Sequence, residues 1–476
     1  MRDEAPIASP LRAVARSDVR SLASRPMYRA SPQTAVPAGS RPPLLRDLST
    51  TWLVALIAVL VVAVGLRIGF AIDPQRPQEP DSIGYARIAK NLSQGNGYQE
   101  GGFRTHLQEP SNYSPGLPLL VAGVYELSGG PHIELARIVL ALIGSLGVLL
   151  AFLIGVRLYG PLAGIVAAVI VAGHPALLQY QGMLMTEPLA VTLLAAALLA
   201  FLRAGDGRGT WAWALPGLLL GLLALVRPDY LLFAPLLALV ALFRARGRGG
   251  AWRPGLAAGA VLLVAFVVPI VPWAIHNAIV LDRFVPISTG GGKALYVGTY
   301  MPADGDGPRL RDELLRDDPA LAQRLSDLPR EARLDTLLAV QAAREHPGVS
   351  TDIALTRIGR ANLDDDVSGD PLGFAGMLGR KVYRAWREGP RPIMHSPGWK
   401  AAQKVLALLA LAGLAILALR RRWESIPVAL LLLGVSANAA LLIASPRRTI
   451  VLVPIIGALA GATLAWAVER LKPERA

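Results

Sequence analysis

Residues 52–72 read WLVALIAVLVVAVGLRIGFAI, and a short polar link joins them to QEPDSIGYARIAKNL at residues 78–92. The first stretch is long and apolar enough to cross the hydrocarbon core of a bilayer, which is about 30 Å thick. The second places two carboxylates, Glu79 and Asp81, where the chain has just left that core. Spanning a membrane requires no such carboxylates, and holding them at the edge of hydrocarbon is costly. The pair therefore predicts a functional site, with Asp81 as the candidate catalytic base.

The composition of the whole chain is that of a membrane protein. Of its 476 residues, 53% are hydrophobic and 17% are charged, and the mean hydropathy is +0.44. These values exceed what a water-soluble surface tolerates. The absence of cysteine excludes disulfides, thiolate chemistry and cysteine-ligated metals. The net charge of +14 resides in short basic segments between apolar runs, a pattern that indicates membrane topology and not a nucleic-acid partner.

The apolar runs predict an all-α polytopic membrane protein with about ten transmembrane helices. The runs that are long enough to cross, or nearly so, are residues 52–72, 133–158, 161–180, 186–203, 211–226, 229–243, 254–274, 400–419, 426–444 and 448–467. A further run, residues 116–125, is too short to cross and is expected to lie against the outer leaflet or dip into it. The pairs Gly217/Gly221 and Gly457/Gly461 have the spacing that permits close helix packing.

Basic residues set the expected orientation. They fall on one face of the predicted bundle, at residues 2–46, 157, 203–208, 244–253, 420–422 and 470–475. The positive-inside rule makes that face the cytoplasm. We therefore expect a multi-pass protein of the cell (inner or plasma) membrane, with both termini in the cytoplasm.

Four regions follow from this organisation. Residues 1–50 are expected to be a disordered, basic cytoplasmic leader, and residues 51–274 a transmembrane module that contains the first outer loop, 73–132. Residues 275–399 are expected to form a small extracytoplasmic layer, and residues 400–476 the last transmembrane helices and a short tail. The helix-like segments of the outer layer lie near residues 309–326, 329–345 and 350–362.

The residues after Asp81 have the pattern of an interfacial amphipathic helix. Tyr85, Ile88 and Leu92 fall on one face, and Gly95-Asn96-Gly97 is expected to end the helix. As its N-cap, Asp81 would lie near the outer mouth of the first span. The alternative is that Asp81 only caps the helix, which leaves the neighbouring Glu79 unexplained.

Several motifs follow one another in a characteristic order. They are Asp81-x-x-x-Tyr85-Ala86, Gly95-Asn96-Gly97-Tyr98, Ser114-Pro115-Gly116-Leu117-Pro118, Met185-Thr186-Glu187-Pro188, Val226-Arg227-Pro228-Asp229 and His276-Asn277, followed by Arg283 to Gly292. In this order the sequence resembles the GT-C membrane glycosyltransferases of the protein mannosyltransferase and aminoarabinose transferase type (glycosyltransferase families 39 and 83). The resemblance covers residues 50–300 well and the last three spans loosely.

The resemblance implies a GT-C-like helical bundle with interfacial helices on its outer face. It also implies transfer of a sugar from a polyprenyl-phosphate donor to a hydroxyl of an envelope glycan, lipid or protein outside the membrane. In the family the acid of the first outer loop acts as the base, and the matching residue here is Asp81. The family often has two adjacent acids at this point, whereas here Ser82 follows Asp81 and Glu79 lies across Pro80. The role of a second carboxylate is therefore open.

The residues present are consistent with this chemistry. Displacing a lipid phosphate from an anomeric carbon needs a base for the incoming hydroxyl and cations for the departing phosphate. The cationic candidates on the expected outer face are Arg67, Arg104, His106, Lys293, Arg447 and Arg448. Arg447 and Arg448 break the positive-inside pattern, which gives them the stronger claim. The alternative for each cation is contact with the phosphates of the surrounding lipids.

Other outer residues could contact the substrates. Glu79 and Tyr85 lie beside Asp81 in sequence. Glu187 could orient sugar hydroxyls, or it could only oppose the dipole of a helix that begins there. Arg227-Pro228-Asp229 suits a tight turn whose charges pair.

No nucleotide or metal site stands out. The glycines of residues 288–293 lack the spacing of a nucleotide-binding loop, although their N–H groups could approach a lipid phosphate. The histidines are dispersed, so a structural metal is not expected, while a transient divalent cation is left open. A transporter or lipid flippase would instead be expected to show charged or broken helices at mid-membrane and internal repeats, whereas the predicted spans are clean in their centres. A structural assembly factor would need no catalytic residues. We therefore interpret the chain as a glycosyltransferase, with a transporter or flippase of envelope lipids or polysaccharide as the alternative.

Overall fold

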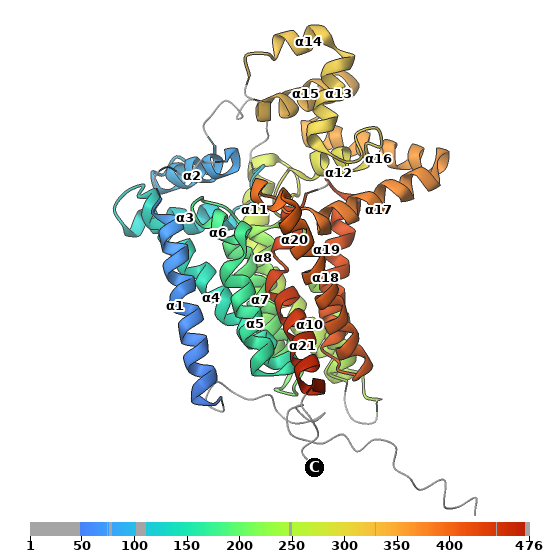
Figure 1. Ribbon diagram of the computed structural model, residues 1–476. Coiled ribbons are helices and arrows are strands. Elements are labelled where there is room, and N and C mark those ends of the chain that lie inside the picture. Colours follow the sequence, from blue (N-terminus) through green and yellow to red (C-terminus); the bar gives the residue numbers. More distant parts are fainter. Residues whose placement is uncertain are drawn as a thin grey trace, which may run out of the picture.

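The structure, a computed structural model, describes residues 48–73, 75, 79–100, 111–246, 250–328, 330–443 and 445–471. Within these ranges every regular element is a helix. Figure 1 shows an upright bundle of long helices with a layer of shorter helices over one end. The predicted all-α membrane fold is confirmed.

The helices of the first half are α1 (Thr50–Ala71), α2 (Pro80–Ser93), α3 (Gly116–Leu127), α4 (Ile133–Tyr159), α5 (Pro161–Gly173), α6 (Pro175–Gln181), α7 (Glu187–Ala204), η4 (Thr210–Trp213), α8 (Ala214–Val226), η5 (Pro228–Tyr230), α9 (Phe233–Arg244), α10 (Arg253–Val267) and α11 (Ile270–Leu281). Those of the second half are α12 (Gly291–Thr299), α13 (Gly307–Asp317), α14 (Pro319–Arg324), α15 (Arg330–Glu345), α16 (Thr351–Gly369), α17 (Pro371–Arg387), η7 (Pro392–His395), α18 (Pro397–Leu419), α19 (Ser425–Leu441), α20 (Arg447–Ile450) and α21 (Val453–Leu471).

Five described helices are long and apolar enough to cross a membrane: α1, α4, α7, α18 and α21. Two bent pairs raise the number to seven if each pair is one span, and the segments 116–127, 210–226 and 425–441 are shorter apolar helices. The stretch expected as one span at 161–180 is α5 and α6, which meet at 52°, and 254–274 falls on α10 and α11, which meet at 47°. A proline at the start of α6 and another just before α11 explain why neither helix runs straight.

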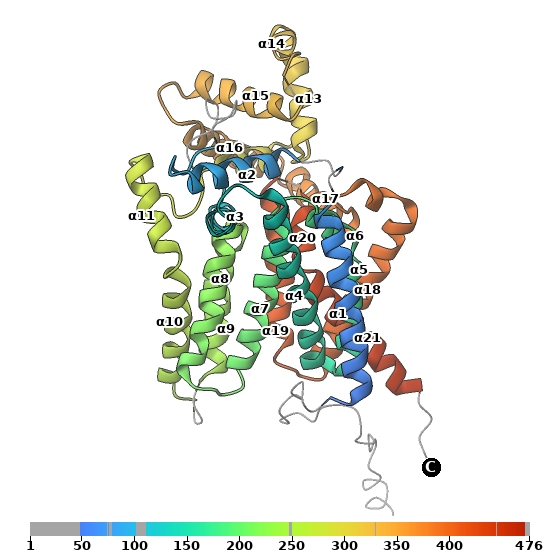
Figure 2. The ribbon, with the colours of Figure 1, turned by 90° about the vertical axis from the view of Figure 1, so that its left-hand side faces the viewer.

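The short helices α2 and α3 cross the end of the bundle. Figure 2 shows α3 nearly end-on and α2 lying across the tops of the long helices. With 12 residues α3 is too short to cross a bilayer, in agreement with the prediction for residues 116–125. These two helices pack on each other through Tyr85, Ile88, Leu117 and Val121.

Small residues bring the long helices together. A methyl group at Gly217 would collide with the carbonyl of Leu262 on α10, and one at Gly461 would collide with the carbonyl of Ala163 on α5. The predicted close packing at these glycines is therefore confirmed. Around the contact at Gly461, α21 packs against α4, α5 and α18.

The layer over the bundle, α12 to α17, has a small core of its own, which includes Tyr296, Leu310, Leu338 and Leu355. The helix expected at 309–326 is divided into α13 and α14. Pro319 starts α14, and the Asp318 side chain accepts a hydrogen bond from the Leu321 N–H at 2.9 Å and caps it. The helix expected at 350–362 continues to Gly369 as α16.

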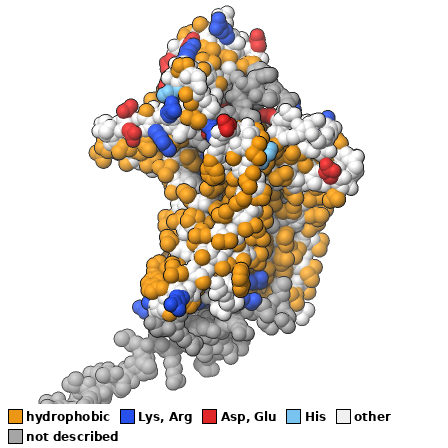
Figure 3. All heavy atoms as spheres, turned by 180° about the vertical axis from the view of Figure 1, so that it is seen from behind, with side chains coloured by type: hydrophobic (Ala, Val, Ile, Leu, Met, Phe, Trp, Pro, Cys, Tyr) orange, Lys and Arg blue, Asp and Glu red, His pale blue; other side chains and the backbone are white. Residues whose placement is uncertain are grey.

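The surface separates apolar and charged residues. In Figure 3 hydrophobic side chains cover the flank of the bundle, and charged side chains gather towards its two ends. α1 begins and α21 ends at the same end, opposite the layer of α12 to α17 (Figure 1). This distribution is that of a multi-pass membrane protein.

Candidate functional site

The N-terminus of α2 presents the two acids of the first loop. Glu79 is the N-cap residue, Pro80 occupies the first helical position and Asp81 follows in the first turn. The expectation that Asp81 is the N-cap is wrong, because proline suits the first position and moves the helix start ahead of Asp81. The predicted end of the helix is confirmed, since α2 stops at Ser93 and Gly95 and Gly97 take φ values of +75° and +79°.

Arg447 joins Asp81 to a second, buried carboxylate. It is the first residue of α20, and its Nη1 donates to Asp81 Oδ2 at 2.9 Å. Its Nε donates to Glu187 Oε1 at 2.8 Å. Glu187 is the first residue of α7 and has no exposed surface. Two acids separated by more than one hundred residues in sequence therefore share one guanidinium.

Glu187 also contacts the turn between α8 and α9. Arg227 Nη1 donates to the same Glu187 oxygen at 3.3 Å, and Arg227 Nη2 donates to Asp229 Oδ2 at 3.2 Å. Arg448 Nη1 lies 3.2 Å from Asp229 Oδ1. The predicted pairing of Arg227 with Asp229 is confirmed, but the pair belongs to a larger cluster.

We call this cluster the charge network. Its members alternate in sign in the order Asp81, Arg447, Glu187, Arg227, Asp229 and Arg448. Because acids and arginines are equal in number, the network is neutral, which lowers the cost of burying it. Its outer end is the more open one, since the Asp81 side chain is 39% exposed and that of Arg448 only 8%.

The environment favours the charged forms of Arg447 and Asp229. Burial alone would lower the pKa of Arg447, but Glu187 and Asp81 outweigh that effect and raise it well above the ordinary value. Burial alone would raise the pKa of Asp229, but Arg448 and Arg227 hold it below the ordinary value. Arg447 and Asp229 are therefore held in their charged forms.

A further arginine approaches the first acid of the loop. Arg391, between α17 and η7, forms an ion pair with Glu79, and its Nε donates to Gln179 Oε1 at 2.7 Å. Its guanidinium carbon lies 5.4 Å from the ring centroid of Tyr180, and that of Arg447 lies 5.6 Å from the same centroid. Arg391 was not among the residues predicted from the sequence. Its only local signal is the rigid Gly389-Pro390-Arg391-Pro392 segment in a loop that is otherwise irregular.

Tyr85 lies four residues after Asp81 in α2. It is buried and packs edge-on against Tyr113, with ring centroids 5.0 Å apart. Burial raises the pKa of Tyr85, and the charge of Asp81 raises it further. Tyr85 therefore remains a neutral phenol beside the candidate base.

Other candidates from the sequence lie apart from the network. Lys293 pairs with Asp335 in the outer layer, and the N–H of Gly292 donates to Asp352 Oδ1 at 2.8 Å. The glycine-rich loop therefore faces α15 and α16. Arg104 and His106 lie outside the described residues. Over the described ranges no three His, Asp or Glu side chains form a group that could hold a metal ion.

Arg67 lies inside the bundle. Its Nη2 donates to the carbonyl oxygen of Val171 at 2.8 Å, and its Nη1 lies 3.4 Å from that of Ala172. These carbonyls end α5, where the bend before α6 deprives them of helical partners. Arg67 thus compensates the broken helix, as buried backbone within a membrane requires.

Replacing Arg67 by methionine should therefore destabilise the fold without changing the chemistry. Unpaired buried carbonyls cost about 1 to 3 kcal/mol each, so the midpoint of thermal unfolding in detergent should fall. The kcat of the folded fraction should equal that of wild type. A lowered kcat at unchanged thermal stability would instead place Arg67 at the reaction centre.

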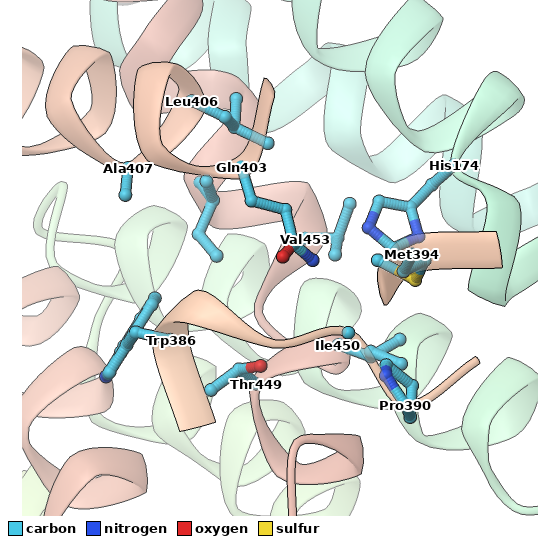
Figure 4. A pocket seen from close by; sticks show the side chains of 12 residues that line it. His174, Trp386, Pro390, Met394, Gln403, Leu406, Ala407, Thr449, Ile450 and Val453 are labelled. Carbon is cyan, nitrogen blue, oxygen red and sulfur yellow. The ribbon is translucent and has the colours of Figure 1, made fainter. Parts of the chain in front are cut away.

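A pocket lies beside α20. Figure 4 shows side chains from η7, α18, α20 and α21 around it. The lining is mainly apolar and includes Trp386, Met394, Leu406, Ile450 and Val453. Arg391 directly follows the lining residue Pro390, and Arg447 lies two positions before the lining residue Thr449. The pocket therefore begins close to the two arginines that contact Tyr180.

The fold and the site together define the class of this protein. It is a helical membrane protein in which acids and arginines pair at one end of the bundle. The profile of the family described as dolichyl-phosphate-mannose-protein mannosyltransferase matches residues 110–273, less than half of the chain. No curated protein matches the sequence.

Solved structures show where the fold belongs. The chain is similar to the archaeal oligosaccharyltransferase AglB from Archaeoglobus fulgidus, in complex with an inhibitory peptide and a dolichol-phosphate. The TM-score is 0.55 at 16% identity, over 89% of this chain and 51% of that chain. The apo form of the Archaeoglobus fulgidus oligosaccharyltransferase matches with a TM-score of 0.53 at 16% identity. The match covers 88% of this chain and 51% of that chain. ArnT from Cupriavidus metallidurans, bound to undecaprenyl phosphate, matches with a TM-score of 0.38 at 17% identity. The match covers 88% of this chain and 79% of that chain.

The chain spans about half the length of the oligosaccharyltransferase that it matches. The fold is similar to that of the archaeal oligosaccharyltransferase, in agreement with the GT-C-like helical bundle that the sequence motifs predicted.

Proposed function

We propose that this protein is a membrane glycosyltransferase that moves a hexosyl or pentosyl group from a polyprenyl-phosphate donor to a hydroxyl of an envelope glycan, lipid or protein. The observation that carries the proposal is the 2.9 Å contact between Asp81 and Arg447. In this contact, a carboxylate that could accept a proton lies beside a cation that could bind a phosphate. These are the two groups that the reaction requires.

In the proposed step, Asp81 accepts the proton of the acceptor hydroxyl while the hydroxyl oxygen attacks the anomeric carbon. The bond between that carbon and the phosphate oxygen breaks, and the electron pair leaves with the lipid phosphate. Arg447 stabilises the charge that develops on the phosphate. Glu187 and Tyr180 hold the Arg447 guanidinium in place from the protein side.

The apolar pocket supports a lipid-linked donor. Arg447 lies two positions before Thr449, which lines the pocket, so a donor phosphate at Arg447 could have the first part of its hydrocarbon chain in this apolar space. The matched oligosaccharyltransferase was solved with a dolichol-phosphate, and dolichyl phosphate is also part of the matching family's description. A water-soluble nucleotide sugar would have no use for this apolar space.

The direct test is transfer by the purified protein. Polyprenyl-phosphate sugars that differ in the sugar should be offered with envelope extracts as acceptors, and products followed by mass. In cells, deleting the protein should remove one sugar from an envelope glycan, glycolipid or protein. Normal envelope glycans together with altered lipid distribution between leaflets would favour a flippase.

A topology experiment tests the proposed orientation in the cell membrane. A reporter that is active only outside the cytoplasm should work when fused near Gly305 and fail near Gly247 or after Ala476, because the basic loops set the orientation. The reverse pattern would place Asp81 beside nucleotide-sugar pools and remove the basis for a lipid donor.

A further inference from the structure

Two acid–arginine pairs meet at one aromatic ring. Glu79 pairs with Arg391, Asp81 pairs with Arg447, and both guanidinium carbons lie within 5.6 Å of the Tyr180 ring centroid. In each pair the arginine is the less exposed partner. The acid side chains are 32% and 39% exposed, whereas those of Arg391 and Arg447 are 14% and 25% exposed.

Both arginines are held by groups other than the acids of α2. Arg391 donates to Gln179 and lies over Tyr180, and Arg447 donates to Glu187 and lies over the same ring. A cation held over an aromatic face keeps its edge N–H groups available for an anion. The arginines would therefore stay in place if Glu79 and Asp81 moved away.

The two acids are the exchangeable members of these pairs. A carboxylate that is about one-third exposed regains contact with water when it leaves its partner. Losing the ion pair therefore costs little free energy. A guanidinium that is mostly buried needs another anion in its place. Phosphate suits this position, because it presents several oxygens to guanidinium donors.

The position of the pocket favours a phosphate that carries a hydrocarbon chain. Arg391 follows Pro390 and precedes Met394, and Arg447 precedes Thr449. All three of these neighbours line the pocket. An anion held by these arginines would thus be close in the chain to residues that line apolar space.

We propose that Arg391 binds the donor phosphate together with Arg447, and that the phosphate displaces Glu79 and Asp81 from these arginines. Asp81 is then released to accept a proton only when the donor is bound. This inference rests on the proposed function and adds a second phosphate-binding residue and an order of events. Glu79 is the resting partner of Arg391 and has no direct part in the chemistry.

Binding of polyprenyl monophosphate without a sugar tests the inference without any turnover. Its Kd for the full-length protein in detergent should rise tenfold or more in Arg391→Gln, because a charge-assisted hydrogen bond is lost. Glu79→Gln should have the opposite effect and lower the Kd severalfold, because the competing anion is gone. Arg391→Lys, which keeps the charge but loses the fork of donors, should fall between wild type and Arg391→Gln.

Arg380→Gln provides the matched control. Arg380 is also paired with an aspartate, Asp304, but lies in the outer layer with its side chain 60% exposed. Its Kd should equal that of wild type. Inorganic phosphate should compete only at far higher concentration if the ligand is a lipid phosphate, and competition at equal concentration would indicate a free-phosphate site and overturn the lipid assignment.

An unchanged Kd in Arg391→Gln, or a raised Kd in Glu79→Gln, overturns the inference. Thermal unfolding of every variant shows whether a raised Kd comes from misfolding. If wild type transfers sugar while Arg391→Gln binds and reacts normally, the inference fails and the proposed function stands. If the Kd values behave as expected but no polyprenyl-phosphate sugar is transferred, the proposed function fails and the phosphate site stands.

Discussion

Asp81→Asn is expected to lower the rate of sugar transfer by about 10²- to 10⁴-fold, the usual effect of losing a general base. The amide cannot accept the acceptor's proton. Its oxygen can still accept the hydrogen bond that Arg447 Nη1 donates to Asp81, so the arginine should remain in place. Because Asp81 is partly exposed, the free energy of unfolding should change by only about 1 kcal/mol.

Steady-state rates and thermal unfolding of the purified variant check this prediction. Glu79→Gln is the matched control, because it removes the neighbouring carboxylate and should reduce the rate less. Wild-type turnover by correctly inserted Asp81→Asn protein would refute Asp81 as the base. The same result for both variants would make Glu187 the next candidate.

Arg447→Gln should have the second large effect, because it removes the cation shared by Asp81 and Glu187. Loss of a group that stabilises charge in the transition state commonly costs about 10²- to 10³-fold in kcat. The variant should also be less stable by about 3 to 5 kcal/mol, since the fully buried Glu187 loses the nearer of the two arginines that contact it in the described part of the chain. Arg447→Lys keeps the charge and should fold, with a lower kcat and weaker donor binding.

Arg448→Lys separates this effect from a general loss of structure. Arg448 pairs with Asp229 at the closed end of the network, so its replacement should affect stability and leave the donor KM unchanged. Kinetics with donor and acceptor varied separately measure the difference. If the Lys variants at 447 and 448 alter donor and acceptor KM equally, the phosphate role of Arg447 is wrong.

Local patterns predicted the local features of this protein. The amphipathic period of α2, its stop at Gly95, and the pairing of Arg227 with Asp229 each depend on residues a few positions apart. Arg447 and Arg448 could be predicted as site residues because they depart from the positive-inside rule for the expected orientation.

Features that depend on distant partners could not be predicted. Glu79 and Arg391 are separated by 312 positions, and no periodicity relates them. Arg67 looked like a free cation at the end of a span, because the sequence does not show that α5 breaks and exposes its carbonyls to it. The start of α2 was placed at Asp81 because capping preference was given more weight than the proline before it.

The length of α1 has a consequence for how the enzyme would meet its donor. Its 22 residues rise about 33 Å, close to the thickness of the hydrocarbon core, and α2 lies across the bundle directly after it. With α1 across the hydrocarbon core, Asp81 would lie near the depth at which membrane lipids carry their phosphates. A lipid donor could reach it by lateral diffusion within one leaflet, without being raised out of the bilayer or drawn into it. The encounter would be a two-dimensional search, and its rate would follow the mole fraction of donor in the membrane instead of its concentration in bulk.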